Sequence, residues 1–158
     1  MILRGWHIDG FGIFQDWQSE TLEPGLTVIL GPNEAGKSTL LAFVRGVLFG
    51  FPDKRSKHRE PLYEPQRGGR PGGRLTVEHE GRRYTVERRA GSRTAAPTIL
   101  DADGQAVPEG ELTRLLGGAD RTLFRNVFGF SLSELQEPAS LTEESVRDRI
   151  FSGAIAGA

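Results

Sequence analysis

The spacing of hydrophobic residues changes along this chain from alternation to a helical period. Residues 2–8 alternate apolar and other side chains, which predicts a strand. The run LTVIL at 26–30 is continuously apolar, which is typical of a strand buried on both faces. Apolar residues at helical spacing then predict an amphipathic helix over 37–49, which Gly50 ends. The first third is therefore expected to contain a strand–loop–helix unit.

The pattern after this helix predicts a flexible loop, a β-hairpin region and a helical part, over residues 51–73, 74–107 and 109–151. The hairpin is expected to turn at Gly81, between two alternating segments. We expect one α/β domain over residues 1–158. Its sheet is expected to be mixed and centred on the strand at 26–30, with peripheral antiparallel hairpins and a helical C-terminal part.

Composition narrows the functional classes. The formal net charge is −1, yet residues 53–93 carry a net +6 between flanks of −2 and −5, which suggests a local anionic partner. The alternative is an arginine-rich hairpin that is simply solvated. The absence of cysteine excludes disulfides, and three scattered histidines do not form a zinc site. No apolar run approaches the roughly 20 residues that span a bilayer. We expect a cytoplasmic protein without membrane partners.

The loop before the predicted helix spells G-x-x-x-x-G-K-S. Gly31 and Gly36 permit a tight turn whose amides converge on a phosphate, and the helix adds its positive end. Lys37 would contact the β- and γ-phosphates, and the Ser38 hydroxyl would ligate Mg²⁺. The motif predicts a fold of the P-loop NTPase class. ATP and Mg²⁺ are therefore the predicted cofactors.

Other parts of an NTPase site are harder to find in the sequence. Asp101 and Asp103, in PTILDADGQ, could imitate a metal-binding strand end, but Asp-Gly also forms a turn. The segment 115–120 (LLGGAD) resembles a transporter-type signature loop, but its glycine pair also serves as a helix stop. We therefore predict that the chain binds a nucleotide with half a site. Alone it is expected to lack the catalytic acid and the signature loop of an ATPase.

Three segments carry a resemblance: HIDGFGIFQDW, GPNEAGKSTLLAFVRGVLFGFP and DRTLFRNVFGFSLSELQ. They resemble the N-terminal segment of YhaN-like proteins, in the group of SMC, SbcC and RecF ATPases, over nearly the whole chain. The resemblance implies an ABC-type head built from both ends of a long polypeptide. This chain would be its N-terminal lobe, without the coiled coil and the C-terminal lobe. Two such heads sandwich ATP and act on DNA, for example in repair, and commonly work with a phosphoesterase-type nuclease.

Carried over residue by residue, the family's nucleotide contacts fall on Gly31, Asn33, Glu34, Ala35, Gly36, Lys37, Ser38 and Thr39, with Ser38 also ligating Mg²⁺. Where relatives have Asn-Phe-Arg near the N-terminus, this chain has Gly-Phe-Gly at 10–12, so Arg4 or the loop 54–59 would have to substitute. The family's catalytic glutamine aligns with Leu132. The nearest glutamine is Gln136, a candidate that can equally be a surface residue of a short helical turn.

Two alternatives remain open from the sequence. A complete small P-loop kinase would use residues 54–93 as its lid. A DNA-binding scaffold with a structural nucleotide would use the basic hairpin at 74–93 to contact phosphates. The arginines of that hairpin region are Arg74, Arg82, Arg83, Arg88, Arg89 and Arg93.

Overall fold

The chain divides into two compact units, Met1–Leu112 and Thr113–Ala158, each taken here by itself. The structure is a computed structural model, and it describes residues 1–52, 63–91 and 96–129. Within these residues, no helix is both long and apolar enough to cross a membrane.

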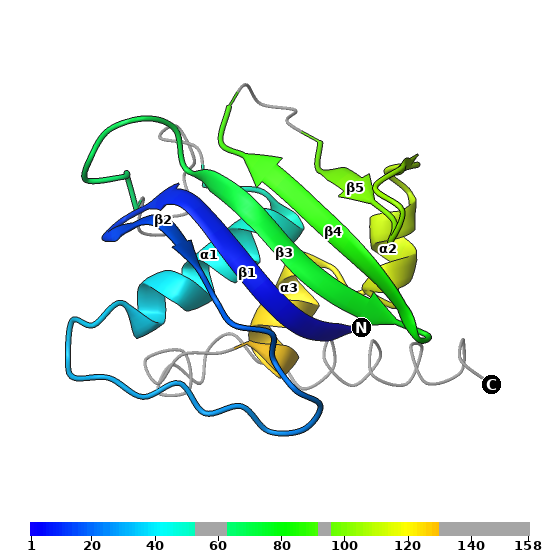
Figure 1. Cartoon of the computed structure of the whole chain (residues 1–158), viewed down its shortest axis with the longest axis horizontal. Coiled ribbons are helices and arrows are strands. Elements are labelled where there is room, and N and C mark those ends of the chain that lie inside the picture. The colour runs from blue at the N-terminus through cyan, green and yellow to red at the C-terminus, as the bar shows by residue number, and fades with distance from the viewer. Residues whose placement is uncertain (53–62, 92–95, 130–158) are drawn as a thin grey trace. The chain divides into compact units, whose positions relative to one another are not determined.

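The first unit is built on one six-stranded sheet in the order β2-β1-β3-β4-β5-β6 (Figure 1). Its strands are β1 (Ile2–Phe11), β2 (Phe14–Gln18), β3 (Gly72–His79), β4 (Arg82–Arg89), β5 (Thr98–Leu100) and β6 (Ala106–Val107). Every pair of neighbouring strands is antiparallel. The β3–β4 hairpin turns at Glu80 and Gly81, as the sequence predicts. The kinase interpretation loses support, because most of the described part of 63–91 lies in sheet strands rather than in a lid.

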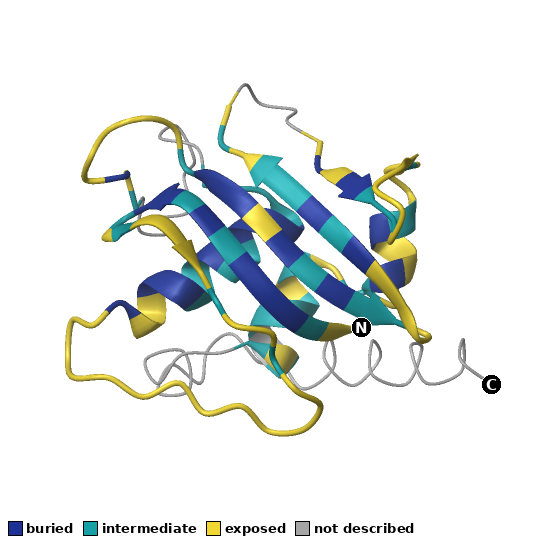
Figure 2. Ribbon diagram, in the orientation of Figure 1, coloured by how far each residue is buried: buried dark blue, intermediate teal, exposed yellow. Residues whose placement is uncertain are grey.

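The hydrophobic core of this unit lies between the sheet and helix α1 (Lys37–Phe49). The strand register places Leu75 beside Val86, and both side chains are fully buried. Phe43 and Val47 of α1 are equally buried and complete the core. Because side chains alternate along a strand, the opposite sheet face carries polar residues, and burial alternates along β3 and β4 (Figure 2). α1 is therefore held by its apolar stripe against one face of the sheet.

The buried strand and the mixed sheet predicted at 26–30 are not present in the described part of the chain. Residues 26–30 lie outside the sheet, in the extended segment that leads into α1 (Figure 2). Leu26 and Leu30 are 92% and 87% exposed. The described sheet supplies no neighbouring strand for this run, and a parallel strand becomes stable only when paired and covered on both faces. The prediction of a buried strand at 26–30 in a mixed sheet is therefore wrong for the described structure, in which the run is exposed.

The second unit begins within helix α2 (Glu111–Leu115) and continues with α3 (Arg121–Leu123) and the π-turn η1 (Phe124–Phe128). Asp120 caps α3, because its Oδ1 accepts the Leu123 N–H at 2.8 Å. The predicted helical part beyond residue 129, including Leu132 and Gln136, lies outside the described residues.

Candidate nucleotide-binding site

The phosphate loop is the turn of residues 31–36 at the start of α1. Glu34 and Gly36 adopt left-handed backbone conformations, with φ of 68° and 92°. The Ala35 amide donates to the Pro32 carbonyl at 3.2 Å, which closes the turn. A β-carbon at position 36 would collide with a neighbouring ring at 2.6 Å, so this position requires glycine for both space and conformation. The loop has the tight, glycine-dependent curvature predicted from the motif.

Lys37 folds back across this loop. Its Nζ donates to the carbonyl oxygens of Gly31 and Pro32, both at 2.7 Å. The ammonium group is exposed and lies over the loop, where an incoming phosphate would meet it. The structure therefore places the predicted cation at the predicted anion site.

The N-terminal end of α1 is open to a ligand. Gly36 is its N-cap and contributes no side-chain hydrogen bond, and the first turn contains no acidic residue. The first amides of an α-helix have no partner within the helix, so they remain available as donors. Ser38 is exposed beside them, whereas Thr39 is buried. This 13-residue helix is aimed at the loop with its positive end uncapped.

These features fit a magnesium-bound nucleoside triphosphate. Lys37 and the free helix amides supply positive charge and donors for the phosphates, and the Ser38 hydroxyl is of the kind that ligates Mg²⁺ in P-loop proteins. Bound Mg²⁺ would neutralise part of the phosphate charge. Of the loop residues, Asn33 and Glu34 are exposed and accessible to a nucleotide.

One neighbour of this site, the tip of the β1–β2 hairpin, could not be identified from the sequence pattern. A β-carbon at Gly36 would lie 2.6 Å from Phe14 Cζ and 2.7 Å from Ile13 Cδ1, so both side chains rest on the loop backbone. Gly12 packs on Thr39, whose Cγ2 would lie 2.9 Å from a β-carbon there. Position 12 is thus a point where the hairpin backbone closely approaches the start of α1.

The acidic candidates for a metal site, Asp101 and Asp103, lie in the turn between β5 and β6. Asp101 Oδ1 accepts the amides of Asp103 and Gln105 at 3.0 and 2.9 Å, so it organises the β5–β6 turn. No cluster of metal-ligating side chains occurs among the described residues. Likewise, Gly117 and Gly118 have φ of 62° and 75° and end α2, so the LLGGAD segment is a helix stop.

The arginines of the basic hairpin separate into two groups. Arg88 donates to backbone carbonyls at the end of α1 and is therefore a structural residue. Arg74 and Arg83 are exposed and line a cavity of about 220 Å³ on the polar face of the sheet, together with Arg4. Arg93 lies outside the described residues. A phosphate-binding surface would therefore use fewer arginines than the sequence suggests.

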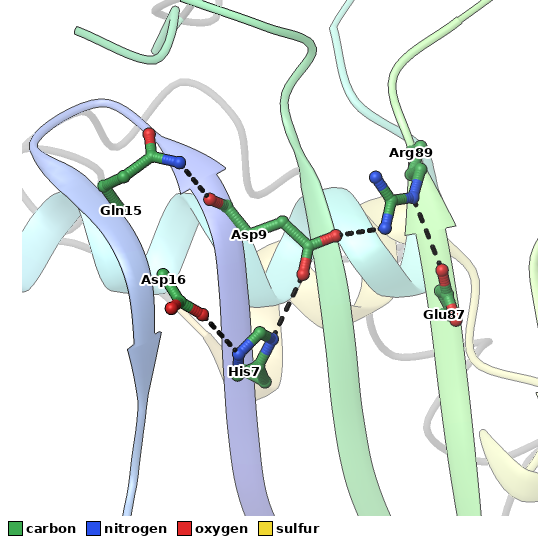
Figure 3. A network of polar contacts seen from close by, with 6 residues as sticks. All are labelled: His7, Asp9, Gln15, Asp16, Glu87 and Arg89. Carbon is green, nitrogen blue, oxygen red and sulfur yellow. Dashed lines mark hydrogen bonds and ion pairs between the residues drawn. The ribbon is translucent and has the colours of Figure 1, made fainter. Parts of the chain in front are cut away.

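Arg89 belongs to a polar network on the same face (Figure 3). It forms ion pairs with Asp9 and with Glu87. The two ring nitrogens of His7 contact Asp9 Oδ1 and Asp16 Oδ1, at 3.1 and 3.0 Å. These contacts join β1, β2 and β4 across the sheet. Arg89 therefore has a structural role in linking the strands.

Comparisons with known proteins agree with a phosphate-loop domain. Residues 1–147 match the family described as an AAA domain. The chain is 32% identical over 154 residues to a Bacillus subtilis (strain 168) protein called uncharacterized protein YhaN. That alignment covers 96% of this chain and 15% of the relative, so the chain spans a small part of its relative's length. The match, with the loop geometry described above, shows that the chain belongs to the AAA-type ATPase family and carries its ATP-binding domain.

Proposed function

We propose that the chain is the N-terminal ATP-binding lobe of an ABC-type head in the SMC, SbcC and RecF group, acting in DNA repair or DNA metabolism. One observation carries this proposal: a complete phosphate loop directly follows an apolar run that has no partner strand in the described part of the chain. The phosphate loop is formed, but none of the described strands pairs with the run that precedes it.

The exposed run at 26–30 supports a missing half. Burying apolar side chains is worth about 25 cal/mol per Å² of apolar surface, so leaving several exposed is unfavourable. Val28 and Ile29 are 65% and 47% exposed, in addition to the two leucines. Strands on both sides of this segment would bury it and satisfy its backbone groups. The C-terminal lobe of the same polypeptide is the proposed source of those strands.

In this proposal the chain binds the nucleotide, and the other half of the head supplies the remaining catalytic groups. Lys37, Ser38 and the loop amides would hold MgATP, and the metal-binding acid and signature loop would come from the C-terminal lobe and a second head. ATP would thus join two copies of the head into a homodimer. A phosphoesterase-type nuclease is the proposed partner of the assembled protein.

Calorimetric titration of the 158-residue chain with MgATP tests this proposal. We expect measurable ATP binding and negligible hydrolysis. Lys37→Ala should weaken ATP binding by at least tenfold without unfolding the chain, because the side chain is exposed and contacts only its own loop. Arg67→Ala, which also removes one exposed positive charge, is the control and should bind ATP normally. Turnover of several per second by the chain alone, an ordinary enzyme rate, would contradict the half-site.

DNA is a second ligand that one observation favours. Within the described residues, the side chain of Arg74 forms no hydrogen bond or ion pair. It lies around a polar cavity together with Arg83 and with Arg4, which is itself paired with Glu78. Arginines gathered on one face are the usual electrostatic footprint for phosphodiesters. The polar face of the sheet, rather than the whole hairpin 74–93, is therefore the proposed DNA-contacting surface.

A further inference from the structure

His7 of β1 lies between two aspartates that belong to different strands. Its Nδ1 is 3.1 Å from Asp9 Oδ1, on the same strand, and its Nε2 is 3.0 Å from Asp16 Oδ1, on β2 (Figure 3). A neutral imidazole has one N–H donor and one acceptor nitrogen, whereas an imidazolium has two donors. Ionised carboxylates only accept hydrogen bonds, so a neutral ring satisfies one of these contacts and a protonated ring satisfies both.

The two aspartates should respond differently when the ring loses its proton. Asp9 has a second partner, because it forms an ion pair with Arg89 on β4, and its side chain is 24% exposed. The Asp16 side chain is 86% exposed, and its contact is with His7. A neutral ring with its proton on Nδ1 still donates to Asp9, and its Nε2 lone pair then faces the Asp16 carboxylate. Deprotonation should therefore break the contact with Asp16.

Asp16 occupies a weak point of the β1–β2 hairpin. β2 is at the edge of the described sheet, where it has β1 as its one neighbour. The described register of these strands omits the pair Asp9–Asp16, although the pairs on either side of it are formed. Asp16 also has a φ of 44°, a left-handed conformation that a residue with a side chain keeps only where its surroundings hold it. The contact with His7 links the two strands at this point.

Charged groups on the neighbouring strands face the same histidine. The two carboxylates that contact the ring favour its positive charge, whereas the arginines oppose it. Arg74 is its register partner on β3, and further charged residues line the same cavity. The charged side chains around His7 on this face are those of Asp9, Asp16, Glu20, Glu87, Arg4, Arg74, Arg83 and Arg89.

We propose that His7 is a pH-dependent clamp, which ties β2 to β1 through Asp16 when the ring is protonated and releases Asp16 when the ring is neutral. The clamp should act on the phosphate loop, because the same hairpin carries Ile13 and Phe14, which rest on the backbone of Gly36. This effect on the loop rests on the proposed nucleotide-binding function. The clamp stabilises the hairpin at mildly acidic pH, and its contribution is lost as the pH rises and the ring deprotonates.

NMR spectra of the 158-residue chain between about pH 5.5 and 8, where histidines change charge, test the clamp directly. The backbone amides of Asp16 and Trp17 should shift with the same midpoint as the His7 ring, and His7→Gln should abolish that shift. The matched control is His79→Gln, at a histidine whose Nε2 is 3.8 Å from an exposed carboxylate, that of Glu80. It should leave the shift unchanged. Amides that do not move with pH, or that move equally in His7→Gln, would overturn the clamp.

Asp16→Asn distinguishes a clamp from a contact that is only structural. An asparagine side chain both donates and accepts, so it can bond to the ring in either protonation state, and asparagine tolerates the left-handed conformation. The amide of Trp17 in this variant should therefore depend little on pH. A variant that remains as sensitive to pH as the parent would contradict the loss of the Asp16 contact.

Calorimetry with MgATP tests the effect on the phosphate loop. The affinity of the parent should fall by about threefold relative to Asp16→Asn as the pH rises from about 6 to 8, a modest change because the Asp16 carboxylate is largely exposed. The ratio of the two affinities cancels the effect of pH on ATP itself. A constant ratio would overturn the link between the clamp and the loop. If MgATP does not bind at any pH, the nucleotide-binding function fails, while the amide shifts still decide the clamp.

Discussion

Arg88 donates from Nε to the Val47 carbonyl oxygen at 2.8 Å, which ties strand β4 to the last turn of α1. Its Nη2 also reaches the Leu48 carbonyl at 3.3 Å. The guanidinium thus satisfies carbonyls at the negative end of the helix whose other end forms the phosphate loop. Arg88, which the sequence analysis included among possible DNA contacts, therefore binds the C-terminal end of α1.

Replacing this arginine should destabilise the fold. Arg88→Met keeps the aliphatic stem but removes charge-assisted hydrogen bonds, so we expect the free energy of unfolding to fall by about 1–3 kcal/mol. Urea denaturation measures the loss. Arg82→Met, on an exposed residue at the other end of β4, should change stability by less than about 0.5 kcal/mol. Equal effects of the two substitutions would contradict the anchoring role.

The ion pair between Arg4 and Glu78 should make the stability of the fold depend on pH. Arg4 Nε donates to Glu78 Oε2 at 2.9 Å, and this bond, opposed by some desolvation, holds the pKa of the Glu78 carboxyl below its ordinary value of 4.5. A pKa lowered by folding stabilises the folded state above about pH 4.5 and loses that contribution as pH falls through the folded value. Glu78→Gln should therefore be less stable than the parent at pH 7, and the gap should narrow toward pH 3.

Urea midpoints measured from pH 7 to pH 3 give this comparison. Arg4→Gln combined with Glu78→Gln should show less than the summed loss of the two single variants, because the residues share one bond. A gap between the parent and Glu78→Gln that stays constant at every pH would show that the carboxyl charge is not involved.

The exposed run should make the chain associate with itself. Leu26 and Leu30 present apolar surface that no described element covers, so contacts between copies should bury it at high concentration. Leu26→Glu with Leu30→Glu should shift sedimentation toward monomer and leave the unfolding midpoint nearly unchanged. Ile2→Glu is a control at another exposed apolar position and should not alter association. A parent chain that remains monomeric at high concentration would contradict this prediction.

The polar sheet face should account for any DNA binding. Arg74→Ala with Arg83→Ala should weaken binding to all sequences alike and reduce the slope of log affinity against log salt by about 2. Fluorescence anisotropy over a salt series measures both quantities. Arg67→Ala with Arg70→Ala removes the same charge from an exposed loop and should have little effect. Equal losses in the two double variants would indicate a diffuse charge effect rather than this face.

The sequence predicted those features that depend on neighbouring residues. The phosphate loop, the helix that ends before Gly50 and the turn at Gly81 follow from local conformation and hydrogen bonding. Features that depend on distant segments were harder to predict. The run at 26–30 has the composition of a central strand. Its pattern cannot show, however, which part of a polypeptide supplies the strands that would pair with it.

At the nucleotide-binding site, too, the features that depend on distant segments could not be predicted from the sequence. The positions of Ile13 and Phe14 on the loop depend on how the β1–β2 hairpin crosses the helix start, and sequence spacing contains no such information. The separate roles of Arg88 and Arg74 follow from strand register, which places alternate residues on opposite faces. The net charge of the segment counts Arg88 and Arg74 equally, so it could not distinguish their roles.

The position of the Lys37 ammonium has one further consequence. Its two acceptors, the carbonyls of Gly31 and Pro32, come immediately after the exposed run in the chain. A lobe that clamps 26–30 into a sheet would fix those acceptors in space, and a phosphate that draws the ammonium away would loosen them. Occupancy of the loop and docking of the lobe would therefore alter each other's equilibrium constants by the same factor, as thermodynamic reciprocity requires.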